Sequence, residues 1–223
     1  MTHLPAPSAR RRALLLGLAA AGSLPLLQGC FPVVATGVGA GAAMIADRRS
    51  SGAYVEDEGI EWKTENRIRE RFGDSVHINA TSYNRNVLLT GEVPSESVRA
   101  EIERITAGVD NVRGIINETV VTAVSSLSAR ANDSLITSNV KARFVDAQRF
   151  SANHVKVVTE ANVVFLLGLV TRAEADAASE VARTSQGVRK VVRVFEYVSE
   201  EDARRLDAGA RSPERSGSEP MVR

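Results

Sequence analysis

The chain has few of the residues that form covalent cross-links and reactive sites. Its 223 residues include one cysteine, Cys30, and three histidines. A single cysteine excludes an internal disulfide. The formal net charge is only +1. A charge so close to zero creates no global field toward nucleic acid, so no nucleic-acid partner is expected.

Catalytic motifs are also absent from the sequence. It contains no nucleophile elbow, no HExxH helix and no glycine-rich loop between a strand and a helix that would hold phosphate. The carboxylates are spread along helix faces, as solubility requires. We therefore expect a protein that is not an enzyme, with no catalytic residue, no metal site, no cofactor and no small-molecule substrate.

The N-terminus has the pattern of a bacterial lipoprotein export signal. The basic residues Arg10–Arg12 precede an apolar run from Ala13 to about Leu27, which closes in Leu26-Leu27-Gln28-Gly29-Cys30. The run is shorter than the roughly 20 apolar residues that a spanning helix needs. A small residue before a cysteine is what a lipoprotein signal peptidase requires. We predict a signal peptide over residues 1–29 and lipidation at Cys30; the alternative is an uncleaved anchor or an ordinary secretory signal.

The segments that flank the centre of the chain have a different composition. Phe31 stands after Cys30, where lipoproteins of the inner membrane commonly carry aspartate, which favours the outer membrane and a periplasmic orientation. We predict that residues 30–59 comprise the acylated cysteine, an Ala/Gly/Val membrane-proximal segment and a polar linker. The alternative for the Ala/Gly/Val segment is a strand or a glycine-packed helix pair with another copy. Residues 199–223 lack apolar periodicity and are predicted to form a disordered tail.

Between these segments, one pattern occurs twice, over residues 60–124 and 130–198. Each copy has the order helix, strand, strand, helix, strand, because apolar residues recur at spacings of three and four in the helices and β-branched residues gather in the strands. In the first copy these residues are Ile68 and Phe72; Val76, Ile78 and Ala80; Val87 to Gly91; Val98, Ile102, Ile105 and Val109; and Ile115 to Val121. In the second copy they are Ile136, Val140 and Phe144; Val155 and Val157; Val163 to Gly168; Ala175, Ala178, Val181 and Ala182; and Val191 to Phe195.

This order of elements predicts the fold class. The last three elements of each copy form a strand–helix–strand crossover, so their two strands are parallel. We predict an α+β fold of two tandem domains, each a small mixed three-stranded sheet with two helices packed on one face. Thr171 and Glu174 form a capping box at the start of one predicted helix. Asn111 and Gly187 stand at corresponding helix ends, where the backbone commonly adopts the left-handed conformation.

These residues resemble a pair of BON domains, a small module of bacterial osmotic-stress and envelope proteins. The resemblance rests on Val87-Leu88-Leu89-Thr90-Gly91-Glu92-Val93 in the first copy. In the second copy it rests on Val164 to Thr171, followed by an alanine-rich helix and Gly187-Val188. With the motif that ends at Cys30, the whole chain resembles a family of dual-BON outer-membrane lipoproteins that locate to the division site and bind anionic phospholipid.

The resemblance implies a function and a site. It implies a non-enzymatic outer-membrane lipoprotein that binds an anionic phospholipid membrane through its second BON domain and supports envelope integrity. In that family the first helix of the second domain contacts lipid, at positions that correspond here to Leu135, Lys141 and Val145. The family carries tryptophan where this chain has Leu135, and the amphipathic tryptophan ring suits the headgroup region better than leucine does.

The residues of the second copy agree with this expectation. Basic residues outnumber acidic ones there, whereas the first copy has more acidic residues. The core stripe of the helix runs from Ile136 to Phe144, which leaves Leu135, Ala142 and Val145 on another face near Lys141. Apolar groups exposed beside a cation suit a membrane interface. The alternatives are a solvated surface with scattered charge, a Leu135 tucked against the helix start, and a Val145 that begins the next loop.

Three glycines and two histidines stand at the ends of elements or at equivalent positions of the two copies. Gly91 and Gly168 end corresponding strands, where we expect a side chain to collide with the neighbouring backbone, and Gly187 ends a helix. His77 and His154 occupy matching positions on the open sheet faces and are expected to be exposed and without ligands. Trp62, which leads into the first helix, is expected to cover the core of its copy.

A competing hypothesis is a periplasmic scaffold or adaptor that binds outer-membrane assembly proteins through the open sheet faces, marked by His77 and Lys156. Exposed apolar residues on those faces would favour a protein interface, either between the two copies or with another chain. A basic rim around Leu135 and Val145 would favour lipid.

Overall fold

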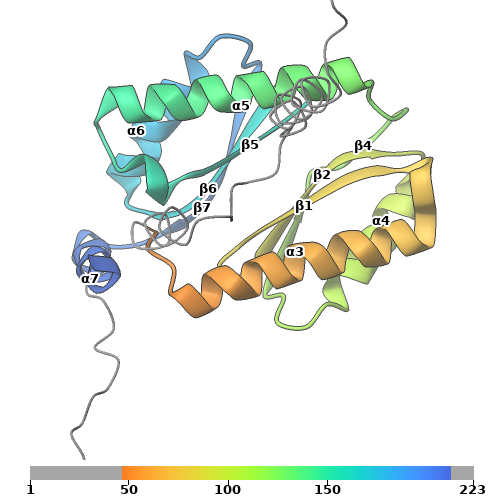
Figure 1. The fold of residues 1–223 in the computed structure, drawn as a ribbon, viewed down its shortest axis with the longest axis horizontal. Helices are drawn as coiled ribbons and strands as arrows, with labels where there is room; N and C mark the ends of the chain where they lie inside the picture. Colours follow the sequence, from red (N-terminus) through yellow and green to blue (C-terminus); the bar gives the residue numbers. More distant parts are fainter. Residues whose placement is uncertain (1–46, 212–223) are drawn as a thin grey trace, which may run out of the picture. The chain divides into compact units, whose positions relative to one another are not determined.

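The structure is a computed structural model that describes residues 47–211 (Figure 1). The predicted signal peptide, Cys30 and the Ala/Gly/Val segment lie outside these residues. Among the residues that are described, no helix is long and apolar enough to cross a membrane. They form two copies of a helix–strand–strand–helix–strand unit, followed by one more helix.

The first copy is built on a sheet of order β1–β2–β3. Its elements are α3 (Ser51–Phe72), β1 (His77–Tyr83), β2 (Asn86–Val93), α4 (Glu96–Ala107), β3 (Gly114–Asn117) and β4 (Val120–Val121). β1 pairs with β2 antiparallel, whereas β3 and β4 both pair with β2 in parallel. The strand predicted over residues 115–121 is therefore present in two short pieces along one edge of β2.

The second copy repeats this arrangement. Its elements are α5 (Leu127–Ala147), β5 (Lys156–Glu160), β6 (Val163–Val170), α6 (Arg172–Arg183) and β7 (Lys190–Tyr197). β5 pairs antiparallel with β6, and β7 pairs parallel with it. In each copy the two helices cover one face of the sheet, and their apolar stripes meet the same face of the central strand (Figure 1). The predicted fold class is confirmed.

Two boundaries differ from the prediction. Helix α3 begins at Ser51 rather than near residue 60, with the Ser50 hydroxyl accepting a hydrogen bond from the amide of Ala53 at 3.1 Å. The predicted polar linker is therefore largely helical. Asp57, in the middle of it, is only 1% exposed, because its carboxylate accepts hydrogen bonds from the β1–β2 turn.

The second difference is at the C-terminal end, where we predicted disorder from residue 199. The chain instead forms helix α7 (Glu200–Arg211), and the rest of the predicted tail, residues 212–223, lies outside the described residues. The Ser199 hydroxyl accepts a hydrogen bond from the amide of Asp202 at 3.0 Å, and acidic residues fill the first turn, where the helix dipole favours them. Ala203 is 3% exposed, so the helix also buries an apolar contact.

The sheet faces that carry no helices are buried against each other. One apolar cluster joins Tyr83 and Leu88 of the first copy to Phe165 and Leu167 of the second, all at most 4% exposed. Polar contacts surround this cluster. Lys156 Nζ lies 2.6 Å from a carboxylate oxygen of Glu61. Asn79 donates a hydrogen bond to Glu160, and both Asn84 and Asn86 donate hydrogen bonds to Glu196. The faces that the adaptor hypothesis assigned to a partner therefore cover one another.

The segment before α3 is held by buried arginines. Arg48 is 5% exposed and forms ion pairs with Glu174 at 2.6 Å and with Asp207 at 2.7 Å. Arg49 pairs with Asp47 and Asp57. The ion pairs of Arg48 join this segment and helix α7 to the second copy, and the pair of Arg49 with Asp57 joins the segment to α3 of the first copy, so neither the segment nor α7 is a free linker.

Candidate functional site

Helix α5 presents two different faces. The hydroxyl of Ser126 caps its start by accepting a hydrogen bond from the amide of Ala129. Ile136, Val140 and Phe144 recur at a spacing of four and are at most 3% exposed, since they form the core of the second copy. The opposite side of the helix therefore points away from the sheet.

That outward side carries exposed apolar residues along the whole helix. Leu127, Leu135 and Val145 are 77%, 65% and 63% exposed. Leu127 and Val145 share one direction because they are about five helical turns apart, and Leu135 lies within about a quarter of a turn of it. We call these three residues the outer stripe. The expected alternatives, a Leu135 tucked against the helix start and a Val145 that begins a loop, do not describe their positions.

The segment that leads into α5 extends this apolar surface. Val120, Val121 and Val124 are 55%, 40% and 42% exposed. Of the large exposed apolar side chains in residues 47–211, most therefore fall between Val120 and Val145. Such a concentration is more informative than isolated exposed residues, which are normal on any surface.

The charge next to the outer stripe is positive. Asp133 is the sole acidic residue between Leu127 and Val145, and its carboxylate is buried and turned to the β5–β6 turn. Lys141 is exposed and forms no ion pair with any described residue. Partial desolvation by the surrounding protein and the charge of Lys156 lower the pKa of Lys141.

Of the three predicted site residues, the structure brings two to one cavity. Lys141 and Val145 line a cavity of about 340 Å³, together with Tyr54 and Lys156. Leu135 lies almost three turns earlier on the same helix and outside the cavity. The predicted residues thus share a helix and a direction, but they do not form a single pocket.

Trp62 is not where we expected it. It is 67% exposed on α3 and covers no core. Val55, two turns earlier on the same side, is 62% exposed. The signal for this was present in the sequence, because Trp62 follows the core residue Ile60 by two positions, which places it on nearly the opposite side of a helix.

The histidines are not exposed as predicted. The side chains of His77 and His154 are only 17% and 12% exposed. His77 Nδ1 lies 3.1 Å from a carboxylate oxygen of Glu92. His154 lies between Glu174 and Asp207, at 3.6 and 3.5 Å. Acidic groups from other strands and helices enclose both rings, and sequence spacing does not reveal such contacts.

The glycines stand where backbones pass closely. A Cβ at Gly91 would lie 2.0 Å from the carbonyl oxygen of His77, and one at Gly168 would lie 2.3 Å from that of His154. Gly91 also has φ of 111°, and Gly187 has φ of 84°. These three glycines therefore serve the packing of strands and of a helix end, and they do not belong to the outer stripe.

Comparison with known proteins finds the same two units. Residues 62–123 and 132–199 each match the family model of the BON domain. The chain is 38% identical over 180 residues to outer membrane lipoprotein DolP of Haemophilus influenzae, covering 79% of this chain and 93% of that protein. It is 36% identical over 154 residues to the 21 kDa hemolysin of Actinobacillus pleuropneumoniae, covering 68% and 79%. It is 27% identical over 160 residues to osmotically-inducible protein Y of Escherichia coli, covering 70% and 80%.

Proposed function

Because the chain belongs to the BON-domain family and carries two copies of the domain, we propose that it is a non-enzymatic outer-membrane lipoprotein that faces the periplasm. It binds anionic phospholipid through the outer stripe of its second domain and supports envelope integrity. The observation that carries this proposal is the outer stripe itself, an exposed apolar row beside the unpaired cation Lys141; the one exposed acidic residue of α5 is Asp146, which follows the last residue of the stripe.

The physical chemistry of this surface suits a membrane interface. Burying one leucine or valine side chain contributes about 1.5–3 kcal/mol, and a basic residue near an anionic surface contributes about 1 kcal/mol. A surface with two or three such groups binds weakly and reversibly. Acylation at Cys30 keeps the domain beside the membrane, so the high local concentration offsets the weak contact.

The similarity to one named lipoprotein supports the location. DolP of Haemophilus influenzae is named as an outer membrane lipoprotein, and the match covers nearly all of that protein. The adaptor alternative placed its partner on the open sheet faces. These faces are occupied by apolar and polar contacts between the two domains, so the exposed surface of α5 is the better supported site.

The test is sedimentation with vesicles. A chain that begins at Asp47 keeps the buried pairs of Arg48 and Arg49 and lacks the lipid anchor. We expect it to sediment with anionic vesicles at low salt, less at high salt, and hardly at all with zwitterionic vesicles. Leu135→Glu and Lys141→Glu should abolish sedimentation, since each brings negative charge to the outer stripe.

The matched control is Val55→Glu, which makes the same kind of change at an exposed apolar position on the corresponding helix of the first domain. It should leave binding unchanged. Failure of the unaltered chain to bind any vesicle would contradict the proposal, as would equal binding by Leu135→Glu and the unaltered chain.

A further inference from the structure

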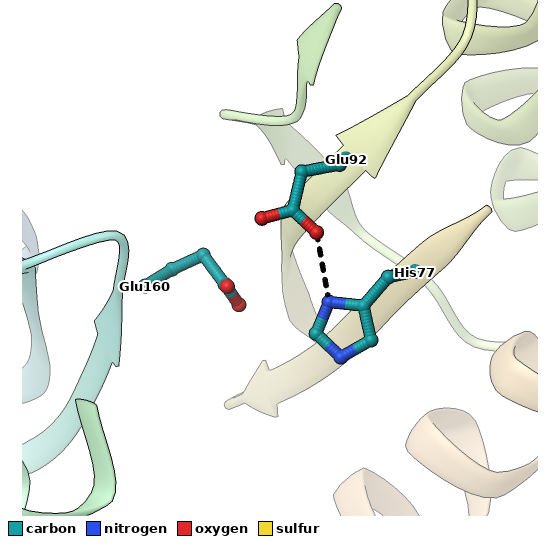
Figure 2. Close-up of side chains that lie close together, drawn as sticks. All are labelled: His77, Glu92 and Glu160. Atoms are coloured by element: carbon teal, nitrogen blue, oxygen red, sulfur yellow. Dashed lines mark hydrogen bonds and ion pairs between the residues drawn. The ribbon is translucent and has the colours of Figure 1, made fainter. Parts of the chain in front are cut away.

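Three strands bring one histidine and two carboxylates together between the two domains. His77 lies on β1, Glu92 on β2 and Glu160 on β5, and one ligand atom of each lies within 4.8 Å of those of the others (Figure 2). His77 and Glu92 are directly opposite each other in the β1–β2 ladder, so the pairing of these strands fixes their approach. Glu160 reaches the pair from the second domain.

The cluster is shielded from water and has more acid than base around it. Glu92 is 5% exposed and Glu160 is 8% exposed. Asp133 lines the same cavity as His77 and Glu160. Several carboxylates thus share a poorly hydrated space, where a cation would be strongly favoured.

The carboxylates also have free acceptor atoms. Glu92 Oε2 faces His77 and accepts a hydrogen bond from the amide of Ser125, and Glu160 Oε2 accepts one from Asn79. The Oε1 atoms of both glutamates accept no hydrogen bond from the described part of the chain. A cavity of about 330 Å³ is lined in part by His77 and Glu160, so a small ion can reach these two side chains.

Arg130 is a cation beside this space, and it forms no ion pair with the carboxylates. It lines the same cavity as His77, Asp133 and Glu160. Its Nε atom is buried without a hydrogen-bond partner, and no carboxylate of residues 47–211 lies within 4.0 Å of its guanidinium. The charge of the two glutamates is therefore not balanced by an ion pair with arginine.

The equivalent histidine of the second domain also lies beside two carboxylates, which come from α6 and α7 rather than from strands. There His154 lies beside Glu174 and Asp207, and Arg48 forms ion pairs with both carboxylates at 2.6 and 2.7 Å. His77 stands at the equivalent place in the first domain, also with two carboxylates. One histidine cluster thus contains a built-in cation, and the other has the ligands for one.

We propose that His77, Glu92 and Glu160 bind one divalent transition-metal ion of the Zn²⁺ class, which joins the two domains. A ring nitrogen with two carboxylate oxygens suits Zn²⁺, with water in the fourth position. The nitrogen ligand disfavours Mg²⁺ and Ca²⁺, which prefer oxygen. Bond lengths of about 2.0–2.2 Å require these three side chains to move closer together than they are in this structure. Because Glu160 comes from the other domain, bound metal resists their separation.

The experiment is a titration of the purified full chain with Zn²⁺ by calorimetry, after removal of metal with a chelator. We expect one ion per chain, a higher melting temperature with Zn²⁺ present, and no comparable effect of Mg²⁺ or Ca²⁺. His77→Gln and Glu160→Gln should each weaken binding at least about tenfold. The matched control His154→Gln removes the equivalent histidine of the second domain and should leave binding unchanged.

A second measurement keeps the proposal testable if a variant folds poorly. Co²⁺ in place of Zn²⁺ should give visible absorption bands of a nitrogen-ligated, four-coordinate ion in the unaltered chain. The proposal is overturned by the absence of saturable Zn²⁺ binding, by binding that persists in His77→Gln, or by equal affinity for Ca²⁺.

Discussion

Asp133 accepts two backbone hydrogen bonds from the β5–β6 turn, as Asp57 does from the β1–β2 turn. The distances are 2.8 and 2.9 Å to the amides of residues 161–162, and 2.7 and 2.8 Å to those of residues 84–85. All four turn residues have positive φ, which directs their amides toward the helix. One carboxylate from the first helix of each domain therefore fixes the hairpin that begins its sheet.

This relationship predicts a loss of stability when either carboxylate is changed. Asp133→Asn should lower the free energy of unfolding by about 1–3 kcal/mol, because an amide side chain can accept only one of the two bonds well. Urea unfolding measures the change. Asp146→Asn, at an exposed position of the same helix, is the control and should have almost no effect. Equal stability of the two variants would contradict the assigned role.

Asp57 makes the stability of the folded chain depend on pH. Burial alone would raise its pKa, but hydrogen bonds from Ser82, from the turn amides and from Arg49 hold the pKa below its ordinary value. A carboxylate with a depressed pKa in the folded state stabilises the protein above its unfolded pKa of about 4, and this contribution is lost as pH falls through the folded pKa. Asp57→Asn should therefore lower stability at pH 7 and weaken its decline below about pH 4. An unchanged acid dependence would contradict this.

Gly91 and Gly168 should tolerate no side chain. Gly168→Val places Cβ against the carbonyl oxygen of His154, so we expect a fall in melting temperature that corresponds to at least about 2 kcal/mol. Gly59→Ala is the control, because nothing lies within 4 Å of a Cβ at that position. It should be neutral or slightly stabilising, as expected for alanine in a helix. A Gly168→Val chain that kept its melting temperature but lost vesicle binding would assign Gly168 to the lipid site.

The sequence predicted the order of elements because each helix and strand has its own periodicity. It did not predict the start of α3, since Asp57 has the charge of a surface residue and is buried only through bonds to a turn beyond β1. It did not predict α7, whose Asp207 pairs with Arg48 across most of the chain. Local pattern holds no information about such distant partners.

The sequence does contain a pattern that predicts the burial of the two sheet faces that carry no helices. Val163 to Leu167 is a continuous apolar run, without the alternation of a strand that faces water on one side. Phe165 and Leu167 are indeed buried between the domains, whereas Val164 and Leu166 face the helices. The outer stripe was predictable from helical spacing. The histidine clusters were not, because their carboxylates come from other elements.

Arg48 should hold helix α7 in place. Arg48→Ala leaves Glu174 and Asp207 without their cation, although both carboxylates keep some contact with water. We expect faster hydrogen exchange across residues 200–211 and a lower melting temperature. Arg205→Ala removes an exposed pair with Asp202 on the same helix and should have little effect. Unchanged exchange in Arg48→Ala would show that α7 is held by other contacts.

Trp62 is the single tryptophan of the chain, so its fluorescence reports one exposed position on α3. If lipid binds through the outer stripe of α5, anionic vesicles should leave its emission maximum unchanged while the protein sediments with them. Leu135→Trp adds a second reporter on the outer stripe, and its emission should move to shorter wavelength as the ring enters the interface. A shift of the Trp62 signal in the unaltered chain would instead assign membrane contact to α3. The comparison thus separates the two exposed apolar faces by a measurement that does not depend on loss of binding.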